Sequence, residues 1–231
     1  MEIRYQYDVM SFAPNLGILP APQRVLWPEL SATPADLILY GDTALALRLG
    51  HRTSVDFDFF SNAPFDAERL AAQLPYLKGA ERLQVAPDTL TCRIDRDGPV
   101  LISFFGGLGL GKVQPPDAIE GMQLAVASLL DIAGTMAAVV QARAEAKDYL
   151  DIDALLRTGM DLATMLAAGT VVYGRTLNPV ITMKALSFFD DLPQLPADIR
   201  QRLSQAVAGV EIARLPVLTP FLSRNEAGRT P

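Results

Sequence analysis

The chain has 231 residues, 20 Lys and Arg against 26 Asp and Glu, and a formal net charge of −6, and half of its residues are hydrophobic. This is the composition of a globular protein with one large domain or two small ones, and its acidic balance disfavours broad, non-specific binding to nucleic acid. The only cysteine, Cys92, excludes an intrachain disulfide, and the only histidine, His51, disfavours a zinc site.

The first half of the chain predicts an alternation of strands and helices. Apolar runs that end at turn residues predict strands, and runs of helix-forming residues with capping residues predict helices. A β-hairpin is predicted where apolar and polar residues alternate around the turn Asp97-Gly98. In chain order we expect a strand at 36–41, a helix at 43–50, a strand at 54–61, a helix at 64–77 and a hairpin at 90–107.

The second half, after the break at Pro115-Pro116, is rich in Ala and Leu and has a helical period. We expect helices within 124–159, 176–192 and 196–215. The fold class is therefore α/β (α+β), with a mixed sheet and flanking helices followed by a C-terminal helical domain. The predicted domains are an arm with one helix at 1–35, a sheet core at 36–115, a helical domain at 118–222 and a frayed tail at 223–231.

No stretch of the sequence predicts a membrane segment. The first residues lack the apolar core of a signal peptide. The longest apolar run, 124–140, contains Asp131 and is shorter than a bilayer requires. We expect a cytoplasmic protein.

Two carboxylates, Asp56 and Asp58, interrupt the apolar strand "SVDFDFFS". Residues i and i+2 of a strand point to the same face, so the two acids stand side by side. A divalent cation, Mg²⁺ or Mn²⁺, relieves both their repulsion and the cost of removing them from water. The alternative is a surface strand with hydrated or arginine-paired acids, which is common for an isolated Asp-x-Asp.

A glycine turn precedes the predicted helix at 43–50. Gly41 ends a strand, Asp42 follows, and Thr43 starts the helix, which is the arrangement of a phosphate site at a helix N-terminus or of an ordinary helix cap. Asp42 would repel phosphate unless it turns away or binds metal. Arg48 and Arg52 lie between the turn and the acids, and either can hold a triphosphate oxygen or simply end a solvated helix.

A second charged cluster lies in "EAKDYLDID" of the helical half. Lys147 and Asp151 are four residues apart and Asp148 and Asp151 three apart, so all three share one helix face. One interpretation is an exposed helix face with ion pairs. The other is part of a functional site, in which Lys147 contacts a phosphate or a nucleobase and an aspartate orients the lysine or acts as a base.

These motifs in this order resemble the AbiEii/AbiGii-type nucleotidyltransferase toxin family, part of the DNA-polymerase-beta-like nucleotidyltransferase superfamily. The resemblance rests on "YGDTALALRLGHRTSVDFDFFS", on "VLISFFGG" and on "ASLLDIAGTMAAVVQARAEAKDYLDIDALL". It implies a nucleotidyltransferase-fold core and a Mg²⁺-dependent transfer of a nucleoside monophosphate from a nucleoside triphosphate (NTP) to tRNA, another RNA or a protein. It also implies a toxin of a toxin–antitoxin or phage-defence system, with a cognate antitoxin as a partner.

The resemblance also carries residue roles onto this chain. The nucleotide-binding turn falls on Gly41, Asp42 and Thr43, the metal-binding and catalytic pair on Asp56 and Asp58, and the later catalytic motif on Lys147, Asp148 and Asp151.

This chain departs from the family pattern at three positions. Asp42 replaces Gly or Ser in the turn, Ser103 stands where the superfamily often has a third acid, and Met136 stands where a lysine commonly follows Asp131-Ile132. These departures leave open a second hypothesis, a catalytically degenerate module that binds nucleotide or a partner protein. A phosphotransferase of the kinase type is a third.

Overall fold

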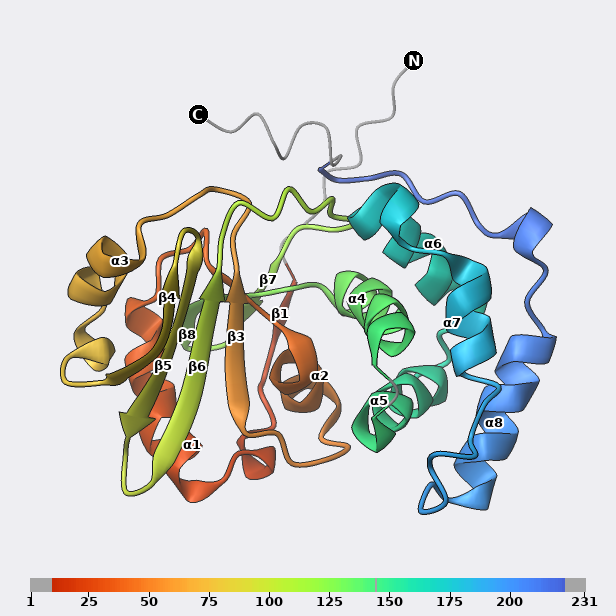
Figure 1. Ribbon diagram of the computed structural model, residues 1–231, viewed down its shortest axis with the longest axis horizontal. Coiled ribbons are helices and arrows are strands. Elements are labelled where there is room, and N and C mark those ends of the chain that lie inside the picture. The colour runs from red at the N-terminus through yellow and green to blue at the C-terminus, as the bar shows by residue number, and fades with distance from the viewer. Residues whose placement is uncertain (1–9, 144, 223–231) are drawn as a thin grey trace. The chain divides into compact units, whose positions relative to one another are not determined.

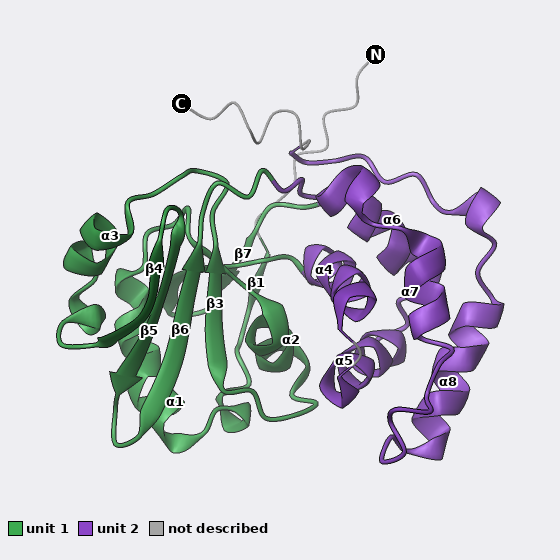
Figure 2. Ribbon diagram, viewed as in Figure 1, with its two compact units in different colours: residues 1–109, 114–128, 228–231 green, residues 110–113, 129–227 purple. Residues whose placement is uncertain are grey.

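The computed structural model describes residues 10–143 and 145–222 (Figure 1). These residues form two compact units, which are coloured separately in Figure 2. Of the described residues, unit 1 takes 10–109 and 114–128, and unit 2 takes the remainder. The predicted tail at 223–231 and the first nine residues of the predicted arm lie outside the described part of the chain. The predicted domain boundaries remain a prediction.

Unit 1 is built on a mixed sheet of eight strands in the order β1-β7-β8-β2-β3-β6-β5-β4. Its strands are β1 (Ser11–Phe12), β2 (Ile38–Tyr40), β3 (Asp56–Phe60), β4 (Glu81–Ala86), β5 (Thr89–Asp95), β6 (Pro99–Phe105), β7 (Asp117–Ile119) and β8 (Met122–Val126). Its helices are α1 (Ala21–Leu26), α2 (Gly41–Leu49) and α3 (Ala67–Gln73), with the 3-10 helices η1 (Leu16–Ile18), η2 (Trp27–Ala32) and η3 (Pro75–Leu77).

The central strand β3 separates a buried face of the sheet from a more open one. Phe57 and Phe59 are fully buried, and the Phe57 ring lies 6.2 Å from that of Trp27 in η2. Asp56, Asp58 and Phe60 alternate with them and are half-buried. The strand pattern therefore places the two acids on one face, as predicted, and the apolar core on the other.

Several predicted elements of unit 1 are confirmed. The glycine turn opens α2, which ends at Gly50 with a left-handed φ of 64°, and Asp66 caps α3 by accepting a hydrogen bond from the Arg69 amide at 2.7 Å. The predicted hairpin is the antiparallel pair β5–β6. The turn at Asp97-Gly98 suits the positive φ that both residues adopt.

The start of the long predicted helix at 124–159 was wrong. Residues 122–126 form β8, which pairs with β7 and with β2, and helix α4 begins only at Leu129. The physical reason is the alternation of buried and exposed side chains in "MQLAV", a period of two that suits a strand.

Unit 2 is helical. It contains α4 (Leu129–Ala142), α5 (Ala146–Arg157), α6 (Leu162–Tyr173), η4 (Gly174–Thr176), α7 (Pro179–Ala185), α8 (Ala197–Ala208) and η5 (Ile212–Arg214). Helices α4 and α6 touch through glycines, since a Cβ on Gly134 would lie 2.7 Å from the Gly169 nitrogen.

Within residues 10–143 and 145–222, no single helix has both the length and the apolar character to cross a bilayer. The segments Ala146–Arg157 and Leu162–Thr176, bent by 115°, meet the criteria of length and composition only when taken together.

Candidate active site

The two acids of β3 occupy a defined place in the sheet. Asp58 is paired in register with Tyr40 of β2 on one side and with Ser103 of β6 on the other. Asp56 is paired with Leu101 of β6. Directly paired residues point to the same face, so Tyr40, Asp58 and Ser103 form a row across three strands. The position predicted for a third acid is thus the position beside Asp58, and a buried serine holds it.

The glycine turn adjoins this row. Gly41 has a φ of 74°, a conformation that favours glycine, and it follows Tyr40 directly at the start of α2. A Cβ built on Gly41 would lie 3.4 Å from Asp58 Oδ2. The first amides of a helix have no partner within the helix, and the Tyr40 side chain does not cap them. The helix N-terminus therefore opens beside the Asp58 carboxylate.

Thr43 ties the first turn of α2 to the start of β3. Its side chain is 2% exposed. Its hydroxyl donates a hydrogen bond to the Asp56 carbonyl and lies 2.8 Å from Ser54 Oγ. The sequence analysis missed Ser54, because its hydroxyl meets Thr43 across eleven residues, a separation that no local spacing rule indicates.

Asp42 and Arg52 form an ion pair at the two ends of α2. Arg52 Nη2 lies 3.0 Å from Asp42 Oδ2, and both side chains are less than a fifth exposed. Arg52 Nη1 also donates to the Thr53 carbonyl at 3.1 Å. The acid in the glycine turn thus has a cation beside it, which reduces the repulsion that Asp42 would exert on an anion.

Arg48 links α2 to the end of the sheet that is formed by β1 and β7. Its guanidinium lies 2.8 Å from Asp117 Oδ2 of β7, donates to the Ala127 carbonyl and stacks over the Phe12 ring at 4.1 Å. Burial lowers the pKa of Arg48, and the attraction of Asp117 opposes that shift. These contacts fix the Arg48 side chain inside unit 1, where it stabilises the packing of α2 against the sheet.

In unit 2, Lys147, Asp148 and Asp151 all lie on α5, as predicted. Asp148 is 1% exposed and Asp151 is 0% exposed, so the face that bears them is not a solvated one. Asp148 forms a capping box with Glu145 and accepts a hydrogen bond from Arg143 Nη2 at 3.2 Å. Lys147 Nζ lies 3.6 Å from Glu145 Oε2. Buried carboxylates at the start of a helix are costly unless they are held by such partners.

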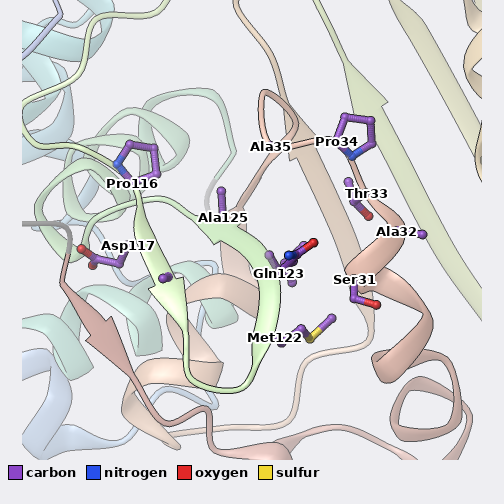
Figure 3. A pocket seen from close by; sticks show the side chains of 12 residues that line it. Ser31, Ala32, Thr33, Pro34, Ala35, Pro116, Asp117, Met122, Gln123 and Ala125 are labelled. Atoms are coloured by element: carbon purple, nitrogen blue, oxygen red, sulfur yellow. The ribbon is translucent and has the colours of Figure 1, made fainter.

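A separate cavity of about 630 Å³ lies against η2 and the β7–β8 hairpin (Figure 3). Its lining consists of residues 31–35, 116–118 and 122–125. None of the predicted site residues lines it, so it does not form part of the candidate active site.

Comparison with known proteins decides the family. The sequence model described as "Nucleotidyl transferase AbiEii toxin, Type IV TA system" matches residues 24–216. The chain belongs to the AbiEii nucleotidyltransferase toxin family. The prediction of this family, made from three stretches that include the Gly41 turn, the Asp56–Asp58 pair and the Lys147–Asp151 motif, is confirmed, and so is the classification as a nucleotidyltransferase.

Relatives of this AbiEii-family chain span most of its length. The Aquifex aeolicus protein aq_aa25 is 32% identical over 159 residues, which cover 68% of this chain and 75% of that protein. The structure of MenT4, a nucleotidyltransferase toxin from Mycobacterium tuberculosis, is similar in fold. It has a TM-score of 0.55 and 16% identity over 83% of each chain. The predicted mixed-sheet fold with flanking helices is therefore confirmed.

Proposed function

We propose that this AbiEii-family protein transfers a nucleoside monophosphate from an NTP to a hydroxyl of an RNA or protein acceptor, and that it does so with Mg²⁺ or Mn²⁺. The single observation that carries the proposal is the close approach of the glycine turn to Asp58, since a Cβ added to Gly41 would lie 3.4 Å from Asp58 Oδ2. A helix N-terminus suited to phosphate and a carboxylate suited to a cation lie side by side in one unit.

The carboxylates of Asp56 and Asp58 fit a divalent cation. They share one face of β3, they are half-buried, and both are hard oxygen donors. The cation would supply charge neutralisation at the transferred phosphoryl group. The backbone of Asp56 is fixed by α2, because the Asp56 carbonyl accepts a hydrogen bond from the Thr43 hydroxyl.

The triphosphate is assigned to the start of α2. The amides that follow Tyr40 attract anionic oxygens, and Gly41 lets a phosphate approach the backbone. Asp42 and Thr43 belong to the same turn, Asp42 as the partner of Arg52 and Thr43 as a positioning residue. Arg52 is the arginine that we assign to a phosphate oxygen, while Arg48 fixes the helix that carries the turn.

Residues of α5 complete the proposed machinery. Lys147 is the cation that we assign to a phosphate or a nucleobase, and Asp148 and Asp151 are assigned to orient it or to accept a proton. The burial of both carboxylates supports a role other than solvation.

The biological role follows from the family. We propose that the protein acts as the toxin of a toxin–antitoxin pair in the cytoplasm, with a cognate antitoxin as its partner.

The test is transfer of label from NTPs in the presence of Mg²⁺ or Mn²⁺ and cell extract. Each NTP is supplied with label on either the α- or the γ-phosphate. Nucleotidyl transfer puts the α label into a macromolecule and releases the γ label as pyrophosphate. Loss of transfer in Asp56→Asn and Asp58→Asn, with Asp97→Asn in the β5–β6 turn as the control, is the expected result. Incorporation of the γ label instead would identify a kinase-type transfer and refute the proposal.

Ser103 supports the second candidate, a binding module without turnover. It stands in register with Asp58 at the position predicted for an acid. Calorimetry with an NTP and Mg²⁺ separates the two functions. Binding without incorporated label supports the module, and binding with incorporated label supports the enzyme.

A further inference from the structure

The residues of α5 that are assigned to the proposed machinery share one side of the helix. Successive residues of an α-helix are turned by about 100° around its axis, so Lys147, Asp148 and Asp151 fall within an arc of about 100°, here called the functional side. The residues two positions before and two positions after Asp151 point about 160° away from it. These residues are Tyr149 and Asp153, which therefore lie on the opposite side of α5.

Tyr149 links this opposite side to the C-terminal end of α7. Its side chain is fully buried, and its ring lies 6.1 Å from the Phe189 ring. Its hydroxyl donates a hydrogen bond to the Ala185 carbonyl at 3.0 Å and lies 3.4 Å from the Phe188 carbonyl oxygen. Burial raises the pKa of Tyr149, so its hydroxyl keeps the proton that it donates.

Asp153 links the same side of α5 to α8. Its carboxylate is 6% exposed and accepts two hydrogen bonds from Arg202, from Nε at 2.6 Å and from Nη2 at 3.2 Å. Arg157 Nε, one turn further along α5, lies 3.4 Å from Asp153 Oδ2. An arginine that donates two hydrogen bonds to one carboxylate fixes its orientation as well as its position.

These two contacts limit the rotation of α5 about its own axis. They lie one turn apart, on either side of Asp151 along the chain, and they reach two different helices of unit 2 (Figure 2). A side-chain oxygen lies about 5–6 Å from the axis of its helix, so a rotation of about 10° moves it by about 1 Å. A misplacement of about 1 Å can slow a reaction by about 100-fold, because the reacting groups are no longer aligned.

We infer that Tyr149 and the pair Asp153–Arg202 are positioning residues for the proposed transfer. They set the rotation of α5 and thereby the place of its functional side. This inference rests on the proposed function. None of the three residues is assigned to the NTP or to the cation, so each acts through α5. The alternative is that the two contacts only stabilise the packing of unit 2.

The first experiment measures the initial rate of α-label transfer into cell extract at saturating NTP and Mg²⁺. Tyr149→Phe removes the hydroxyl and keeps the buried ring, and Arg202→Met removes the guanidinium. Each variant is expected to lower the rate by about 10–100-fold at a temperature well below its Tm. The KM for the NTP is expected to stay within about threefold of the wild-type value, because the triphosphate is assigned to the start of α2.

Each variant has a matched control that removes a similar hydrogen bond elsewhere. Tyr76→Phe removes a buried hydroxyl that lies 2.8 Å from Thr33 Oγ1 in unit 1. Arg200→Met removes an arginine of α8 that donates to the Leu195 and Pro193 carbonyls. Both controls are expected to lower the Tm and to keep the rate within about twofold of the wild-type value. If variants and controls lose the rate equally, the two contacts only stabilise the fold and the inference is refuted.

The second experiment tests the two contacts without any activity. Hydrogen exchange followed by mass spectrometry reports the opening of the α5 amides in the ligand-free protein. Tyr149→Phe and Arg202→Met are expected to speed exchange in α5 by about 2–10-fold, the effect of one lost hydrogen bond. The two controls are expected to leave exchange in α5 unchanged. Unchanged exchange in Tyr149→Phe and Arg202→Met would overturn the inference.

The outcomes separate the inference from the proposed function. If the wild-type protein transfers the α label and both variants keep the wild-type rate, the positioning role is refuted and the proposed function stands. If the wild-type protein transfers no label from any NTP, the proposed function is refuted. The positioning role is then refuted with it, whatever the exchange of α5, because there is no transfer for these residues to support.

Discussion

Replacing Gly41 by alanine separates backbone strain from nucleotide binding. Gly41 has a φ of 74°, and an added Cβ would lie 3.4 Å from Asp58 Oδ2. Gly121, in the β7–β8 turn, has the same φ of 74° with no atom within 4 Å of an added Cβ. The two glycines therefore share the conformational penalty and differ in what the new methyl group meets.

The expected loss of stability is small and equal in the two variants. An alanine in the left-handed region costs about 1–2 kcal/mol, and the reduced freedom of its unfolded chain returns about 0.4–1 kcal/mol. The net loss is about 1 kcal/mol, which lowers the Tm of a chain of this size by about 2–4 °C. Thermal unfolding without ligand measures this effect for Gly41→Ala and Gly121→Ala.

Thermal unfolding with an NTP and Mn²⁺ then measures binding. A ligand at about 100 times its Kd stabilises the native state by about 2.7 kcal/mol, or about 5–10 °C. The wild-type protein and Gly121→Ala are expected to show this rise. Gly41→Ala is expected to lose most of it, because the methyl group occupies the approach to the helix N-terminus and to Asp58. An equal rise in both variants would refute the role of Gly41.

Three further predictions follow from the buried contacts. Thr43→Val removes the donor to the Asp56 carbonyl, so it is expected to lower the free energy of unfolding in urea by about 1–3 kcal/mol and to weaken Mn²⁺ binding. Thr43→Ser keeps the hydroxyl and is expected to keep both the stability and the Mn²⁺ affinity. Equal Mn²⁺ affinity in the two variants would contradict this. Arg48→Met leaves the buried Asp117 carboxylate without its cation and is expected to lower the free energy of unfolding in urea by about 3–5 kcal/mol. Adding Asp117→Leu should restore most of the lost stability. If the double variant is no more stable than Arg48→Met, the ion pair does not have this role. Cys92 is buried, which raises the pKa of its thiol, so it is expected to react with Ellman's reagent at pH 8 only after unfolding in urea; rapid reaction of the native protein would contradict its burial.

Local patterns were enough to predict how the part of the candidate site on β2, α2 and β3 is arranged. Period-two alternation placed Asp56 and Asp58 on one face, and a glycine between a strand and a helix located the turn at Gly41. Both signals arise from neighbours along the chain, which sequence patterns record directly.

Pairings between distant segments were beyond these patterns. The strands β7 and β8 are short and their pairing with β1 and β2 depends on tertiary context, so residues 122–126 were expected to be helical. The role of Arg48 was open for the same reason, since its partner Asp117 lies far along the chain. The position of Ser103 beside Asp58 depends on strand register, which becomes visible only in the folded sheet.

The most direct test of the proposed activity is the position of a bound cation. Crystals grown with Mn²⁺ and a non-hydrolysable NTP analogue, measured at a wavelength with strong manganese anomalous signal, locate the ion. The expected result is a peak within coordination distance of one carboxylate oxygen each of Asp56 and Asp58, with the triphosphate at the Gly41 turn. A nucleotide bound elsewhere, or manganese that ignores both carboxylates, would contradict the proposed active site.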